Sequence, residues 1–279
     1  MRFLALFLAS TSALRVDVRQ NTSRVLLLLP ELNYPGRTTD NVTRSDAEVE
    51  ALVQQLREHS AATQHVAASL LDGYGCKVIT RFWVTNAIAA EASPACLDGL
   101  RLHQSAATSG WRVASDEPWR VPVGRSGPGR AQQDPLSAGA EWNVKWIGAE
   151  AVGHKYETRG HGMVHACADT GVEYTHPALV QQYRGNTFEP EHEQFDHNFN
   201  WFDATQYIDP PPGEPSVCEQ GVRHPCDDHG HGTHCTGTTS GGAPSEAIGV
   251  APHSLWIGCR NMYNGLGTPS SYLGCLQAC

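Results

Sequence analysis

The chain has 279 residues, 40% of them hydrophobic and 18% charged, so it can bury a sizeable core in one large or two modest globular domains. Its 29 acidic and 20 basic residues give a formal net charge of −9 at pH 7, and no run rich in Lys and Arg is present. Such a chain offers little to a phosphate backbone, and we expect no nucleic-acid partner.

The N-terminus has the pattern of a secretory signal. A basic second residue precedes a short apolar run and then small residues up to Ala13, where we expect cleavage of a signal covering residues 1–13. A buried N-terminal strand or helix is the alternative interpretation, since the run is short even for a signal. It is far too short to span a bilayer, so no membrane partner is expected. The triplets at Asn21 and Asn41 are candidate glycosylation sites and fit a secreted glycoprotein.

The nine cysteines fit an oxidising compartment, and their odd number leaves at least one thiol unpaired. Cys218 and Cys226 bracket a short loop and are a candidate local disulfide. Cys76 and Cys96 are a second candidate pair. Their spacing alone does not establish either pairing.

The region of residues 22–117 predicts strand, helix, strand, helix, strand. Its first helix opens with the capping box of Ser45 and Glu48, and the β-rich segment VITRFWVTNAIA, residues 78–89, follows it. The second helix has Ser93 as its N-cap, directly before a proline. We therefore expect a small α+β, ferredoxin-like domain of the split-βαβ kind.

Residues 118–139 are rich in Pro, Gly, Arg and Gln and have no periodicity, which indicates an exposed linker open to proteolysis.

A second domain, residues 140–279, begins with a helix-compatible stretch. The apolar run MVHACADTGV, residues 163–172, then suits a strand of a parallel sheet buried on both faces. Asp169 lies where this strand ends, the place where functional residues collect in such sheets, although an aspartate there can also simply cap the turn.

The stretch DDHGHGTHCTG, from Asp227 to Gly237, admits three interpretations: a metal site, a catalytic histidine on a tight turn, or a solvated polar loop. His229, His231 and His234 have the pattern H-x-H-x-x-H, which offers enough donors for zinc. The ligands would need an open geometry that a helix start does not obviously provide, because His229 falls on the preceding glycine turn.

Two motifs resemble those of a known family. DDHGHGTHCTGTTSG, residues 227–241, resembles the histidine signature of subtilisin-like serine proteases, and ACADTGVEYTHPAL, residues 166–179, resembles their aspartate signature. They occur in the family's order, aspartate first. QYRGNTFEPEHEQFDHNFNWFD, residues 182–203, resembles the bacillopeptidase F-like branch, and IGVAPHSLWIGCRNM, residues 248–262, resembles the strand after the histidine motif.

The resemblance, which covers Trp142 to the last residue, implies the N-terminal half of a doubly wound parallel α/β sheet. Asp169 would accept the Nδ1–H of His231 and leave Nε2 free to take a proton from a serine hydroxyl. His234 would face inward, and Cys235 would lie beneath the pair as an unreactive buried thiol, with a redox role as the alternative. No metal is expected at this motif and no cofactor is required; a structural calcium ion fits the family, but no ligand set can be assigned.

The family's serine nucleophile lies in a G-T-S-[MA] motif far beyond the histidine, with the oxyanion-hole asparagine between them. No residue after His231 forms that motif. GTTSG, residues 237–241, continues the histidine helix, and GTPSS, residues 267–271, precedes the next helix. We therefore expect two members of the triad in this chain and no activity of the chain alone. A longer transcript that encodes the serine and an artefact of gene prediction are both compatible with this pattern.

FWVTNAIAAEAS, residues 82–93, resembles the strand and turn of subtilase propeptides, which implies that residues 22–117 are a folding chaperone and temporary inhibitor of their own enzyme. An adhesion or sugar-binding module is the alternative for this domain.

We interpret the whole as the zymogen of a secreted serine endopeptidase acting on proteins and peptides, with the maturation site in residues 118–139. The alternative function is a truncated, inactive homologue that binds or inhibits proteases through its propeptide-like domain.

Overall fold

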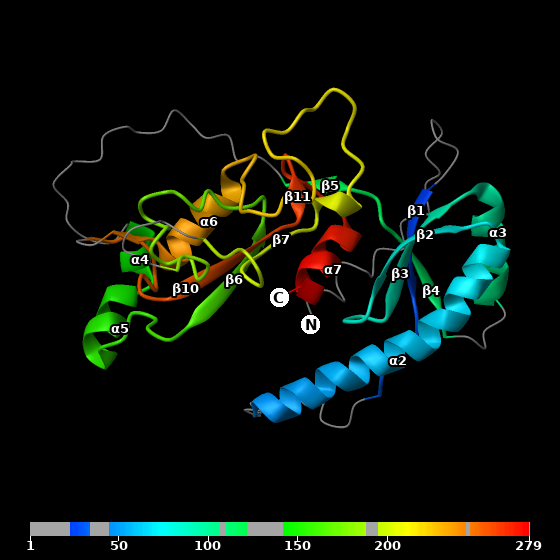
Figure 1. Ribbon diagram of the computed structural model, residues 1–279, viewed down its shortest axis with the longest axis horizontal. Coiled ribbons are helices and arrows are strands. Elements are labelled where there is room, and N and C mark those ends of the chain that lie inside the picture. Colours follow the sequence, from blue (N-terminus) through cyan, green and yellow to red (C-terminus); the bar gives the residue numbers. More distant parts are fainter. Residues whose placement is uncertain are drawn as a thin grey trace. The chain divides into compact units, whose positions relative to one another are not determined.

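The computed structural model describes residues 23–33, 45–105, 110–121, 142–187, 195–243 and 246–278. The chain forms two compact units, residues 1–117 and 118–279 (Figure 1). The expected signal, Asn21 and Asn41 lie outside the described residues. Within the described residues, no helix combines the length and the apolar character that crossing a membrane requires.

The N-terminal unit is a four-stranded antiparallel sheet with two helices. In chain order its elements are β1 (Ser23–Leu28), α2 (Asp46–Gly73), β2 (Lys77–Phe82), β3 (Ala87–Ala92), α3 (Pro94–Ser105) and β4 (Arg112–Ser115). The spatial order is β2-β3-β1-β4, the arrangement expected for a split-βαβ unit. The segment of residues 78–89, expected as one β-rich stretch, is a hairpin of two strands, because the chain reverses at Asn86 with a φ of +47°.

One hydrophobic cluster joins both helices to the same face of this sheet. Leu71 of α2 and Leu97 of α3 pack with alternate residues of β1 and β3. The expected capping box is present: Glu48 accepts the backbone N–H of Ser45 at 2.8 Å, and Ser45 accepts that of Glu48 at 3.4 Å. A disulfide between Cys76 and Cys96 ties the end of α2 to α3.

The C-terminal unit is built on a parallel sheet. Its elements are β5 (Trp119–Arg120), α4 (Trp142–Trp146), α5 (Ala149–Tyr156), β6 (Val164–Asp169), β7 (Trp201–Asp203), the 3-10 helix η1 (Thr205–Tyr207), α6 (His231–Ser240), β8 (Gly242–Ala243), β9 (Glu246–Ala247), β10 (Leu255–Arg260), β11 (Met262–Tyr263), β12 (Leu266–Gly267) and α7 (Pro269–Ala278). The sheet order is β6-β10-β7, and Arg260 pairs in register with both Asp169 and Asp203. Three charged residues therefore meet at the carboxyl ends of the three strands.

Helices lie on both faces of the parallel sheet. Asp169, at the end of β6, faces His231 of α6. In β10, Arg260 pairs with Asp169, and the preceding residue, Cys259, forms a disulfide with Cys275 of α7. Because successive side chains of a strand point to opposite faces, α6 and α7 cover opposite sides. The expected fold class, an α/β unit with a parallel sheet preceded by a small α+β unit, is confirmed.

Two local expectations differ from the structure. β6 is an edge strand rather than one buried on both faces, and its alternate side chains Val164, Ala166 and Ala168 are exposed because α7 packs mainly beside β7 and β10. The expected linker, residues 118–139, also contains a strand among its first residues, and residues 122–139 lie outside the described part of the chain. Trp119 and Arg120 form strand β5, which pairs with β12 of the C-terminal unit.

Candidate active site

A carboxylate and an imidazole meet where β6 ends and α6 begins. Oδ1 of Asp169 lies 2.7 Å from Nδ1 of His231. The side chain of Asp169 is 13% exposed and that of His231 is 43% exposed, so the outer edge of the ring is open to solvent. A carboxylate at Nδ1 favours the tautomer that carries its proton there, which leaves Nε2 free to act as a base.

Glycines allow the two segments to approach this closely. A Cβ on Gly171 would lie 1.8 Å from the carbonyl oxygen of Cys226, and one on Gly232 would lie 2.1 Å from the carbonyl oxygen of Gly171. Gly230, the N-cap of α6, has a φ of +84°. The glycines on both sides of His231 therefore serve a close backbone contact and a left-handed turn.

Asp227 organises the first turn of α6. Its carboxylate accepts the backbone N–H groups of His229, Gly230 and Thr233 at 2.8–3.0 Å, and the Thr233 hydroxyl at 2.5 Å. Burial would raise the pKa of Asp227, but the hydrogen bonds, that of the Thr233 side chain first, outweigh burial and lower this pKa below its ordinary value. The ionised carboxylate is thus the form that holds the helix start.

Thr170 connects this turn to the end of β6. Its hydroxyl donates to Asp227 at 2.8 Å and accepts the backbone N–H of Gly232 at 2.9 Å. Its own N–H donates to Oδ1 of Asp169 at 2.7 Å, the oxygen that also faces His231. The orientation of the carboxylate and the position of the histidine are therefore set by one connected group of hydrogen bonds.

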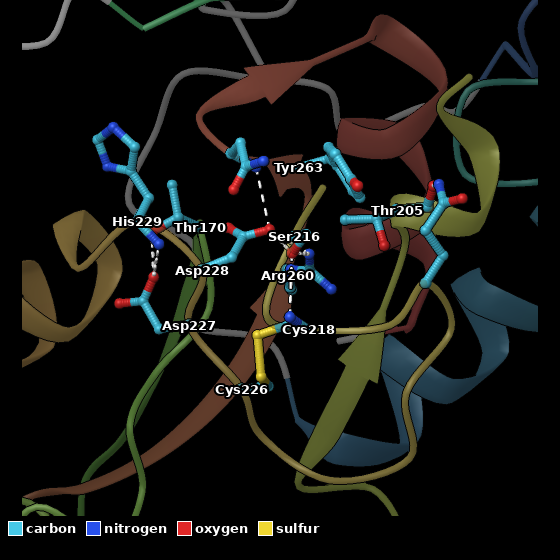
Figure 2. A network of polar contacts seen from close by, with 12 residues as sticks. Thr170, Thr205, Ser216, Cys218, Cys226, Asp227, Asp228, His229, Arg260 and Tyr263 are labelled. Carbon is cyan, nitrogen blue, oxygen red and sulfur yellow. Dashed lines mark hydrogen bonds and ion pairs between the residues drawn. A yellow bond between two sulfur atoms is a disulfide. The ribbon is translucent and has the colours of Figure 1, made fainter. Parts of the chain in front are cut away.

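A buried guanidinium supports the loop before α6 (Figure 2). Arg260 is fully buried at the end of β10 and forms ion pairs with Asp203, at 3.1 Å, and with Asp228. Asp228 also accepts the hydroxyl of Ser216 at 2.7 Å and the backbone N–H of Asn264 at 3.0 Å. Charges removed from water in this way require such partners, so the network fixes the loop that leads into His231.

The structure joins Cys218 and Cys226 by a disulfide, which closes the loop beside this network (Figure 2). Sequence reasoning missed the third disulfide, between Cys259 and Cys275, and the roles of Arg260 and Asp228. The signal for this network was Arg260 itself, at the end of the apolar strand LWIGCR. A charge is rarely buried in such a strand without a partner, so a buried acidic partner could have been expected.

His229, His231 and His234 do not form a metal-binding cluster in the described part of the chain. The expectation that His234 faces inward is wrong: its residue is exposed, because it lies on the same side of α6 as the solvent-open His231. Cys235 does lie close to the pair, with Sγ 3.7 Å from Nδ1 of His231. It is partly rather than fully buried, and burial first, then the charge of Asp169, raises the pKa of its thiol.

The serines considered as nucleophiles are occupied elsewhere. Ser240 and Ser271 are fully buried. Ser240 donates to the carbonyl oxygen of Thr236, and Ser271 donates to that of Asn261 at 2.7 Å. Neither hydroxyl is available to a substrate.

Residues 160–274 match the family described as the subtilase family. Bacillopeptidase F of Bacillus subtilis (strain 168) is 41% identical over 144 residues, which are 48% of this chain and 8% of that protein. The chain therefore spans a small part of the length of this curated relative.

Solved structures with a similar course of the chain include a mutant of the Epidermin Leader Peptide Processing Serine Protease from Staphylococcus aureus. Its TM-score is 0.49 at 13% identity, over 87% of this chain and 44% of that one. Fervidolysin from Fervidobacterium pennivorans, described as a keratinolytic enzyme related to subtilisin, has a TM-score of 0.43 at 16% identity, over 90% of this chain and 32% of that one.

Proposed function

We propose that the protein is a serine endopeptidase of the subtilase family that hydrolyses peptide bonds in proteins, with Asp169 and His231 as two members of its triad, because residues 160–274 match that family. The observation that carries the proposal is the 2.7 Å contact between Oδ1 of Asp169 and Nδ1 of His231, at the carboxyl end of a parallel strand. The solvent-open edge of the ring leaves room for a serine and a substrate.

In this mechanism His231 is the general base and then the general acid. Nε2 takes the proton of the serine hydroxyl as the oxygen attacks the scissile carbonyl, and later gives it to the leaving amine. The carboxylate of Asp169 stabilises the imidazolium in between. The serine has no match among the 279 residues, so this chain supplies the acid–base half of the chemistry.

The proposal extends to a secreted precursor. Strand β5 follows the N-terminal unit in the chain and pairs antiparallel with β12, with Trp119 opposite Gly267 and Arg120 opposite Leu266. The carboxylate of Glu214 holds Arg120 at 2.6 Å, so β5 is an integral part of the C-terminal unit. The proposed role of residues 22–117 as a temporary inhibitor rests on their resemblance to subtilase propeptides. The three disulfides among the described cysteines fit an oxidising compartment.

A fluorophosphonate probe tests the endopeptidase proposal, because it labels a serine that a neighbouring base activates. We expect no labelling of the 279-residue chain. If the transcript continues past the codon of Cys279, the longer product should be labelled, His231→Ala should abolish the labelling, and His234→Ala, in the same helix, should retain it. Labelling of the longer product that survives His231→Ala would contradict the assignment of the base.

A second candidate is a protease-binding protein without activity of its own, and the closed core of the N-terminal unit supports it. The discriminating measurement is inhibition of a subtilisin-type protease by the 279-residue chain. Inhibition together with a longer product that no fluorophosphonate labels would favour this second candidate over the endopeptidase.

A further inference from the structure

Three metal-ligating side chains converge beside the imidazole of His231. Within the described residues, Asp169, His231 and Cys235 are the one group of three or more whose ligand atoms all lie within 4.8 Å of one another. We propose that this group binds a thiophilic divalent cation, Zn²⁺ or Cd²⁺, through a thiolate, an imidazole nitrogen and a carboxylate oxygen. The binding stands on this geometry alone, whereas its regulatory consequence rests on the proposed function.

The spacing of the ligand atoms fits tetrahedral coordination. With bonds of about 2.3 Å to sulfur and about 2.0–2.1 Å to nitrogen and oxygen, neighbouring ligand atoms lie about 3.3–3.6 Å apart. Sγ of Cys235 is 3.7 Å from Nδ1 of His231, close to this range. Oδ1 of Asp169 is 2.7 Å from the same nitrogen, so the carboxylate has to move away by about 0.6 Å to reach the spacing of tetrahedral ligands.

The scaffold positions the ligands before any ion arrives. His231 and Cys235 are four residues apart in α6, a spacing that places two side chains on one face of a helix. Asp169 comes from the end of β6, which the helix start approaches through Gly171 and Gly232. Both elements are fixed by the hydrogen bonds of Thr170 and therefore need little rearrangement.

The composition of the group selects the kind of cation. A thiolate, an imidazole and a carboxylate together favour zinc and its softer relatives over Ca²⁺ or Mg²⁺, which take oxygen ligands. His231 is 43% exposed and Cys235 is partly buried, so solvent can reach the group and a water can fill the fourth position. The neighbouring carboxylate of Asp227 adds negative charge, although its own oxygens serve the backbone of α6.

A cation bound at this position prevents His231 from acting as the general base. Coordination at Nδ1 of His231 moves the ring proton from that nitrogen to Nε2, and only the thiol proton of Cys235 is released to solvent. The neutral ring then carries its proton on Nε2, the nitrogen that has to accept one from the serine. The metal also takes the carboxylate oxygen of Asp169 that orients the ring. Binding would therefore hold the pair in an inactive state.

The two free cysteines of the described chain provide a matched pair of variants. Cys167 lies in β6, and burial raises the pKa of its thiol to about 11. The parent for the experiment is the full 279-residue chain with Cys279→Ser, so that Cys167 and Cys235 are the thiols compared. Cd²⁺ is titrated into this parent, its Cys235→Ser variant and its Cys167→Ser variant. The thiolate-to-metal absorption is recorded, and affinity is measured against a chelator.

We expect one equivalent of thiolate-bound Cd²⁺ in the parent and in Cys167→Ser, and none in Cys235→Ser. Loss of an outer-shell partner already lowers metal affinity by roughly 10–100-fold, so loss of the thiolate should lower it by at least about tenfold. Asp169→Asn should weaken binding while the thiolate absorption remains. Absence of the absorption from the parent, or its loss in Cys167→Ser with retention in Cys235→Ser, would overturn the proposal. Because no readout uses proteolysis, failure here leaves the endopeptidase proposal to its own test.

Discussion

At the scale of single residues, Asp227 offers a pH-dependent test. Its pKa in the folded protein is lowered, so its ionised form stabilises the fold above the ordinary aspartate pKa of about 3.9, and the contribution is lost as the pH falls through the folded value. Asp227→Asn should lower the free energy of unfolding at pH 7 by about 1–3 kcal/mol, because several backbone N–H groups lose a charged acceptor. Urea unfolding measured from pH 7 to pH 3 should show the difference between variant and parent shrinking at the acid end.

The control for this prediction is Asp98→Asn, an exposed carboxylate of the N-terminal unit that pairs with Arg101 at the surface. It should change the free energy of unfolding by less than about 1 kcal/mol at either pH. A deficit of Asp227→Asn that stays constant down to pH 3 would contradict the assigned role of the ionised carboxylate.

The sequence predicts the role of a residue when that role depends on a short local motif. Asp169 and His231 lie in short motifs whose glycines and order are visible in the chain, and the structure places their side chains 2.7 Å apart. Arg260 and Asp228 are 32 positions apart, and only the fold brings their charges together. The inward direction expected for His234 was wrong because the exposed side of α6 is decided by packing rather than by spacing.

At the scale of elements, the start of α6 tests the need for glycine. In Gly232→Ala the new Cβ would lie 2.1 Å from the carbonyl oxygen of Gly171, so the helix start has to move away from β6. Overpacking of this kind costs about 1–3 kcal/mol. Gly237→Ala, one and a half turns later in the same helix, meets nothing within 4 Å and should stabilise by about 0.5–1 kcal/mol.

Thermal unfolding followed by circular dichroism measures both glycine variants. Histidine NMR of Gly232→Ala should in addition show loss of the Nδ1–H resonance of His231, because the ring moves away from Asp169. Equal stability of the two variants would mean that the close approach of the segments is not required.

The buried network of β10 supports a second prediction at this scale. Arg260→Met leaves Asp203 and Asp228 without their cation in a buried position, and removal of one partner of such a pair costs about 3–5 kcal/mol. Arg120→Met is the matched control. It breaks a pair with Glu214 whose side chains are 40% and 45% exposed, and such a pair is worth about 0–1 kcal/mol. Chemical unfolding of both variants measures the difference, and a similar loss in the two would show that burial of Arg260 adds nothing.

Elements with strong local signals could be predicted, and those defined by their partners could not. The capping box of Ser45 and Glu48 marked the start of α2, and the apolar run before Asp169 marked β6. The hairpin of β2 and β3 was hidden because the turn before Asn86 carries no glycine. Strand β5 has two residues and exists through its pairing with β12, which lies more than a hundred positions later.

At the scale of the whole molecule, the two units obtain their stability in different ways. The N-terminal unit closes one hydrophobic cluster between two helices and a four-stranded sheet, and a disulfide spans it. The C-terminal unit has smaller clusters and relies more on polar networks and two further disulfides. The length and composition of the chain were compatible with two domains. They could not predict which of the two would expose apolar side chains to solvent.

Apolar exposure in the C-terminal unit gathers in a short stretch that runs from α4 to β6. Its large exposed side chains are Trp142, Trp146, Ile147, Val152, Tyr156, Met163 and Val164. α5 has no buried residue, so this helix contributes nothing to the core of the unit. Exposed apolar side chains that are clustered along the chain, unlike single scattered ones, favour association.

We therefore expect the 279-residue chain to self-associate through this stretch. Trp146 and Ile147 are 81% and 65% exposed, so Trp146→Gln with Ile147→Gln removes apolar surface without opening the core. The double variant should shift the mass measured by light scattering toward the monomer and reduce binding of a hydrophobic dye. Leu102→Gln is the control, because this leucine is 72% exposed in α3 of the N-terminal unit, outside the stretch. A parent that is monomeric at all concentrations, or a control variant that dissociates the chain equally well, would show that association does not depend on the exposed face of residues 142–164.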